Sequence, residues 1–138
     1  MSETPTPQQI RDTMPFAALI GAELVEVSAE QVVGAMAWAP ERCTAGGLMH
    51  GGALMALADG CGGTLAFFNL PEGALGTATI ESKTNFMRGV RDGSVRAVSR
   101  PLHRGRTTIV VETELTDEQG RLVAKVTQTQ AFVLPRSG

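Results

Sequence analysis

The chain has 138 residues, of which 43% are hydrophobic and 19% are charged, and its formal net charge is −2. This length and composition are typical of one globular domain over residues 1–138 and leave no room for a second domain. The slightly acidic balance gives no indication of binding to nucleic acid or to an anionic membrane. The first residues lack the basic start and the apolar run of a secretory signal, so we expect a cytoplasmic protein.

Residues 1–18 predict an N-terminal extension that contains a short helix. Apolar side chains recur among polar ones between Pro7 and Leu19, and Pro15 would interrupt the helix before an apolar turn. The alternating apolar residues of Ile20–Val27 and Gln31–Ala39 then predict two strands, which the short connection between them would join as a hairpin. A loop that contains two glycines follows.

A long helix is predicted to begin at about Gly51 or Gly52. At 100° per residue, its apolar side chains fall on one arc, which is typical of a helix packed against a sheet: Leu54, Leu57, Ala58, Cys61, Leu65 and Phe68. The opposite arc is expected to hold Asp59 beside small or apolar residues: Met55, Gly62, Gly63 and Ala66. Because each glycine costs about 0.5–1 kcal/mol in a helix interior, this arc indicates the close approach of a second backbone or of a ligand.

The second half of the chain predicts four further strands, separated by Gly, Asp or Gln-Gly turns. They cover Ala74–Met87, Gly93–Arg104, Arg106–Leu115 and Arg121–Leu134. In the third of these, every second residue is expected to face a core: Thr107, Ile109, Val111, Thr113 and Leu115. Two strands, one long helix and four strands predict an α+β domain in which an antiparallel sheet covers the helix.

The candidate catalytic groups are Asp59 and the turn His50-Gly51-Gly52. Covering its helix face would desolvate Asp59 and raise its pKa, which makes the carboxylate more basic. An exposed Asp59, or one bonded to a neighbouring loop, is the structural alternative. The first N–H groups of the helix lack partners and can stabilise a polarised carbonyl oxygen, as in an oxyanion hole. A turn that needs positive φ would also explain the two glycines.

Within a single chain, the Gly51 amide and the Asp59 carboxylate are too far apart to act together on one small carbonyl group. Roughly 12 Å separate Gly51 from Asp59 along a helix that rises about 1.5 Å per residue. If the amide and the carboxylate act on the same atom, they must come from two copies of the chain, across a twofold interface between antiparallel helices. Each dimer would then hold two equivalent sites.

Three segments carry a family resemblance: HGGALMALAD at residues 50–59, ATIESKTNFMRGV at 78–90 and GSVRAVSRPLHRGRTT at 93–108. In the predicted strand order, they resemble the hotdog-fold acyl-CoA thioesterases, especially those related to the phenylacetate-pathway and 4-hydroxybenzoyl-CoA enzymes. The resemblance implies the hotdog fold, an antiparallel sheet wrapped around one long central helix, and a homodimer or a dimer of dimers. It also implies that no metal or cofactor is needed, since coenzyme A is part of the substrate.

The resemblance further implies roles for individual residues. Asp59 matches the catalytic carboxylate of the family, which either attacks the thioester carbonyl or activates a water. Gly51 matches the residue whose N–H polarises the thioester oxygen, His50 a residue that positions this turn, and Thr79 a hydroxyl that helps to hold the water. Thr44 stands six residues before His50, where relatives commonly carry Asn or Gln, and its side chain is shorter and has no amide donor.

Six arginines lie within residues 88–106. A solvated strand face would explain them, and so would an anionic small ligand, whereas the segment lacks the stacking aromatics that are usual in nucleic-acid-binding sheets. The resemblance places two segments near the pantetheine and phosphates of coenzyme A: Phe86, Met87 and Arg88, and the turn His103, Arg104, Gly105 and Arg106. Guanidinium groups suit phosphate because they can bond two of its oxygens at once.

The sequence therefore predicts hydrolysis of an acyl-CoA, with an aryl or a short or medium acyl group, to the free acid and coenzyme A. The alternative is a domain of the same fold that binds an acyl-CoA without turning it over, against which Asp59 argues. A hydratase of this fold would need a differently placed Asp/His pair, which is not found. Cys43 and Cys61 lack metal-site spacing and are expected to be reduced thiols, and His50 and His103 are too isolated for a metal site.

Overall fold

The computed structural model describes residues 3–136 and begins with two short helices, α1 (Pro7–Asp12) and α2 (Pro15–Leu19). Thr6 caps α1: its hydroxyl accepts the Gln9 N–H, and the Gln9 side chain accepts the Thr6 N–H. Pro15 is the first residue of α2, where its missing N–H is not needed. The predicted interruption at Pro15 is confirmed, but a second helix stands in place of the predicted apolar turn.

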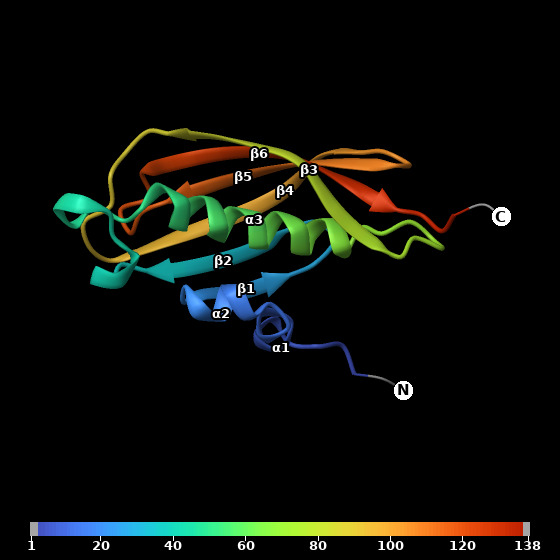
Figure 1. Ribbon diagram of the computed structural model, residues 1–138, viewed down its shortest axis with the longest axis horizontal. Helices are drawn as coiled ribbons and strands as arrows, with labels where there is room; N and C mark the ends of the chain where they lie inside the picture. Colours follow the sequence, from blue (N-terminus) through green and yellow to red (C-terminus); the bar gives the residue numbers. More distant parts are fainter. Residues whose placement is uncertain (1–2, 137–138) are drawn as a thin grey trace.

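Six strands form one antiparallel sheet in the order β1-β2-β4-β5-β6-β3 (Figure 1). Their bounds are β1 (Ala22–Val27), β2 (Val32–Ala37), β3 (Gly76–Phe86), β4 (Ser94–Arg104), β5 (Thr108–Thr116) and β6 (Leu122–Val133). All six predicted strands are confirmed, with small differences at their ends. β1 and β3 are the edge strands.

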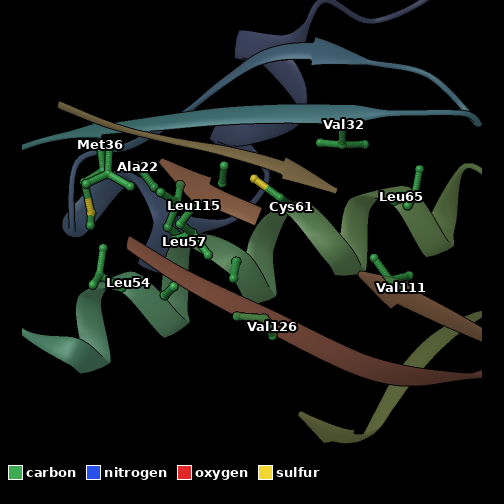
Figure 2. Close-up of a cluster of buried hydrophobic side chains, with 14 of the residues drawn as sticks. Ala22, Val32, Met36, Leu54, Leu57, Cys61, Leu65, Val111, Leu115 and Val126 are labelled. Atoms are coloured by element: carbon green, nitrogen blue, oxygen red, sulfur yellow. The ribbon is translucent and has the colours of Figure 1, made fainter. Parts of the chain in front are cut away.

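The long helix α3 (Gly51–Phe67) lies across one face of the sheet and contacts all six strands. Its apolar side chains meet those of the strands in one continuous core (Figure 2). Gly34 of β2 allows this approach, because a side chain there would collide with the thiol of Cys61. Cys61 is a free thiol, and its burial raises its pKa to about 12. No helix within residues 3–136 is both long and apolar enough to cross a membrane.

The buried face of α3 is wider than the helical wheel predicts. Gly62 and Ala66, which the wheel places on the outer arc, are buried. β6 passes over Gly62, and the side-chain amide of Gln128 lies 2.5 Å from where a Cβ atom of residue 62 would be. The sheet thus curls around α3 farther than one apolar stripe indicates. Met55 and Asp59 lie on the outer face, as predicted, and both are exposed in the single chain, which is the structural alternative for Asp59.

Candidate active site

Asp59 lies on the exposed face of α3, within reach of the edge strand β3. Its carboxylate accepts a hydrogen bond from the Thr79 hydroxyl. Desolvation raises the pKa of Asp59 above its ordinary value, and the hydrogen bond from Thr79 opposes part of this rise. The structure therefore brings together the predicted acid and the predicted water-holding hydroxyl, and it makes the carboxylate more basic than a fully solvated one.

A buried amide holds Thr79 in place. Gln130 of β6 pairs with Thr79 in the sheet, and its Nε2 donates to the Thr79 Oγ1 at 2.7 Å. Only 1% of Gln130 is exposed, so this bond is shielded from water. Because Oγ1 accepts from Gln130, the hydroxyl hydrogen is left to point at Asp59. Sequence reasoning missed Gln130; the available signal was a glutamine at an inward-facing position of an otherwise alternating strand.

Asp59 opens into a cavity of about 520 Å³ beside the C-terminal half of α3. The outer face of α3, the helix α1 and the strands β3 and β6 all contribute to its lining. The largest apolar side chains of the lining are Ile10, Met14, Phe67 and Phe68. The volume lies within the range of roughly 300–1,000 Å³ that is typical of small-molecule sites.

The N-terminal end of α3 presents a backbone amide without a partner. His50 is the N-cap residue, and its Nδ1 accepts the Gly52 N–H at 2.8 Å. The Gly51 N–H, the first of the helix, donates to no residue within 3–136. Because its Nδ1 is an acceptor, His50 carries its ring hydrogen on Nε2 in this arrangement. The cap thus fixes the turn and leaves the Gly51 N–H free at the positive end of the helix dipole.

A second cavity, of about 350 Å³, lies against this end of α3. Five of the predicted site residues line it: Thr44, Gly51, Phe86, Met87 and Arg88. The Phe86 ring lies 3.2 Å from where a Cβ atom of residue 51 would be, so any side chain there would press on the ring. The structure therefore places the free amide beside the segment that the family resemblance places near coenzyme A. The contacts of these residues with substrate stay predictions.

The predicted residues of the β4–β5 turn do not join this cavity: His103, Arg104, Gly105 and Arg106. His103 and Arg104 line a separate depression with two neighbours on β4. The strand register places the turn at the other end of the sheet from Phe86, since Phe86 pairs with Ala124 and the residue after the turn, Thr108, pairs with Ala131. Within one chain the two segments therefore lie apart, and the prediction that both lie near coenzyme A stays a prediction.

The arginines of residues 88–106 also fall into two groups, at different ends of the sheet. Arg100 and Arg104 hydrogen-bond to the β1–β2 turn, at the Gln31 side chain (3.0 Å) and the Ala29 carbonyl (2.9 Å). These two side chains have structural partners, as the strand-face alternative expects. Arg88 instead lines the cavity next to the free amide, where a guanidinium group can meet phosphate oxygens.

Residues 46–124 match the thioesterase superfamily. The chain belongs to this family. Among its relatives, ComA2 of Bacillus subtilis (strain 168) is 35% identical over 104 residues, which cover 75% of this chain and 82% of the relative. The 1,4-dihydroxy-2-naphthoyl-CoA hydrolase of Escherichia coli (strain K12) is 38% identical over 87 residues, which cover 63% of this chain and 63% of the relative.

The structural likeness extends over nearly the whole thioesterase chain. A crystal structure of a mutant of the thioesterase PA1618 from Pseudomonas aeruginosa superposes with a TM-score of 0.87 at 28% identity, covering 95% of this chain and 96% of that one. The predicted hotdog fold and the predicted membership among the thioesterases are thereby confirmed. His50, Gly51, Asp59 and Thr79 lie inside the segment that matches the superfamily, whereas Thr44 and Gln130 lie outside it.

Proposed function

We propose that this thioesterase hydrolyses an acyl-CoA to the free acid and coenzyme A at a site shared by two subunits. Asp59 would supply the carboxylate, and the partner subunit's Gly51 the amide that stabilises the thioester oxygen. One observation carries the proposal: a basic carboxylate and an unpaired amide lie on the same helix but in different cavities. Their separation of roughly 12 Å is too long for one carbonyl group.

The chemistry follows from these two groups. Attack on the carbonyl carbon moves negative charge onto the thioester oxygen, which the amide N–H stabilises. Asp59 either attacks that carbon itself or takes a proton from a water held by Thr79. In both routes the C–S bond then breaks, and coenzyme A leaves as a thiolate that takes up a proton. After direct attack, water hydrolyses the anhydride between Asp59 and the acyl group and restores the carboxylate. An oxygen of water therefore ends in the acid by either route. The proposal includes no metal or cofactor, and residues 3–136 contain no cluster of three potential metal ligands.

Exposed apolar side chains support a twofold interface over this face of the molecule. They lie on α3, on β3 and just after it, and they are 41–59% exposed: Met55, Phe67, Ile80, Phe86 and Met87. Isolated monomers rarely expose such a group of large apolar side chains. β3 is also an edge strand, whose free N–H and C=O groups can pair with the same strand of a second copy. We therefore propose a homodimer, alone or as half of a tetramer.

The two cavities suggest how a substrate would be divided between the subunits. The acyl group would extend from Asp59 into the larger cavity. Coenzyme A would leave past Arg88, which lines the smaller cavity with Gly51. Arg88 would then meet phosphate oxygens, which its guanidinium group can bond in pairs.

Substitution of Asp59 tests the proposed function. Asp59→Asn keeps the shape of the side chain and removes the base, so kcat for thiol release from an acyl-CoA is expected to fall by about 10²–10⁴-fold. Asp92→Asn is the matched control, because Asp92 is exposed and lines neither cavity. Wild-type turnover in both Asp59→Asn and Asp59→Ala would refute the assignment. Tight binding of acyl-CoAs by the wild type without thiol release would favour a binding domain instead.

A further inference from the structure

The helix α1 forms one wall of the cavity that contains Asp59. Figure 1 shows α1 and β3 on opposite sides of α3. The cavity-lining residues of α1 and its C-terminal end are spaced as one face of a helix: Gln9, Ile10, Thr13 and Met14. Arg11 fixes α1 to the sheet, because its Nη1 donates to the carbonyl of Ala22 in β1 at 3.1 Å. The wall is therefore attached to β1 and not to α3, and the cavity lies between the two helices.

The cavity combines large apolar side chains with uncharged polar ones, which include Gln9 and Thr13 on the α1 side. Phe67 and Phe68 pack edge to face with ring centroids 6.0 Å apart, and they line the cavity together with the apolar side chains of Ile10 and Met14. Asp59 is the only charged side chain among the described residues that line the cavity. A second carboxylate in this space would meet a like charge in a partly desolvated setting, which is unfavourable.

We propose that this cavity receives the acyl group of the substrate and that α1 determines which acyl groups fit. The inference rests on the proposed function, since the carbonyl carbon must lie at Asp59 and the rest of the acyl group then extends along α1 toward Phe67. The substrate class is an uncharged acyl group with a sizeable apolar body, either aliphatic or aromatic. An acetyl group would leave most of the 520 Å³ unfilled, and an acyl group that ends in a carboxylate would be repelled.

A panel of coenzyme A thioesters, followed by thiol release, tests this substrate class. The panel contains acetyl-, hexanoyl-, octanoyl- and phenylacetyl-CoA, together with adipoyl-CoA, which has the chain length of hexanoyl-CoA and a terminal carboxylate. For the wild type, kcat/KM is expected to rise about fourfold for each buried methylene between acetyl and octanoyl. It is expected to be at least about tenfold lower for adipoyl-CoA than for hexanoyl-CoA.

Two tryptophan variants test the role of α1. Ile10→Trp and Met14→Trp add bulk inside the cavity, so each is expected to lower kcat/KM for octanoyl- and phenylacetyl-CoA by about tenfold or more, while acetyl-CoA is spared. Gln8→Trp is the matched control, because it adds the same bulk to α1 at a position outside the lining. α1 contains no buried residue and Met14, which precedes α2, is only half-buried, so all three variants are expected to fold.

The outcomes separate this inference from the proposed function. The ratio of kcat/KM for octanoyl-CoA to kcat/KM for acetyl-CoA decides the role of α1. A ratio that stays at the wild-type value in both cavity variants, or that falls equally in Gln8→Trp, would overturn that role. A wild-type preference for adipoyl-CoA over hexanoyl-CoA would overturn the assigned substrate class. In either case Asp59→Asn still reports independently on hydrolysis. A wild-type protein that releases thiol from no member of the panel would refute the proposed function and this inference with it.

Discussion

A proline at position 51 tests the shared site most directly. Proline is favoured at the first position of a helix, and His50 before it has φ −63° and ψ 132°, which a residue preceding proline readily adopts. Gly51→Pro therefore removes the amide N–H and keeps the start of α3. Gly51→Ala is the matched control, because its Cβ atom approaches the same Phe86 ring and the N–H remains.

Loss of one oxyanion donor lowers kcat by about 10²–10³-fold, or roughly 2.7–4 kcal/mol of transition-state stabilisation. We expect this loss for Gly51→Pro in thiol release from the best acyl-CoA of the panel. Gly51→Ala is expected to retain most of the activity, since Phe86 is half exposed and its ring can move aside. Equal losses in the two variants would show that crowding at Phe86, and not the amide, is responsible.

Mixing two inactive variants then shows whether the site is shared. In a hybrid dimer of Gly51→Pro and Asp59→Asn, one site holds both lesions and the other holds neither, provided that the amide and the carboxylate come from different subunits. Random pairing at equal expression makes about half of the dimers hybrid, so about a quarter of wild-type activity should return, against about 1% or less for either variant alone. A mixture as inactive as its parents would refute the shared site.

The remaining predictions concern the support of the carboxylate and the packing of α3. Thr79→Val removes a hydroxyl that lowers the pKa of Asp59, so the acid limb of the kcat/KM profile, where Asp59 becomes protonated, should move to higher pH; an unmoved limb would contradict this assignment. Gln130→Leu should lower kcat and leave KM nearly unchanged in steady-state assays. Gly62→Ala places a Cβ atom 2.5 Å from a buried amide of β6 and should lower the free energy of unfolding in urea by about 1–3 kcal/mol, whereas Gly60→Ala, with nothing within 4 Å, should not.

The strands could be predicted because alternation is a local signal. Side chains of a strand point alternately to two faces, and only one face of this sheet meets α3. Of the predicted inward residues, Ile109, Val111, Thr113 and Leu115 of β5 are fully buried. Thr107, predicted on the same face, precedes the strand and is exposed, so that part of the prediction is wrong. The predicted turn between β5 and β6 is also a local feature, in which Asp117 accepts hydrogen bonds from the backbone of Gln119 and Arg121.

The buried face of α3 and the support of Thr79 depend on contacts that no local pattern contains. Whether Gly62 faces water or a strand is decided by how far the sheet curls around the helix. Gln128 comes close to Gly62 of α3, and Gln130 comes close to Thr79. Both contacts depend on the position of β6, which pairs with β3 although the two segments are far apart in the sequence. The wall formed by α1 likewise depends on the bond from Arg11 to β1. A single sequence shows the residues on each element but not which element each of them faces.

Three groups that lack a partner or a cover in the single chain are the ones that the proposed reaction and the proposed dimer need. The Gly51 amide has no acceptor within residues 3–136, Asp59 is exposed on a face with large apolar side chains, and the β3 edge has no neighbouring strand. Each feature alone would be unfavourable, because unpaired backbone groups and apolar patches promote non-specific association. A second copy related by a twofold axis would cover the patch and pair the edge, and it would bring each amide to the other chain's carboxylate, where the thioester oxygen becomes its acceptor. An active monomer would have none of these partners, so the proposed dimer and the proposed chemistry depend on the same surface.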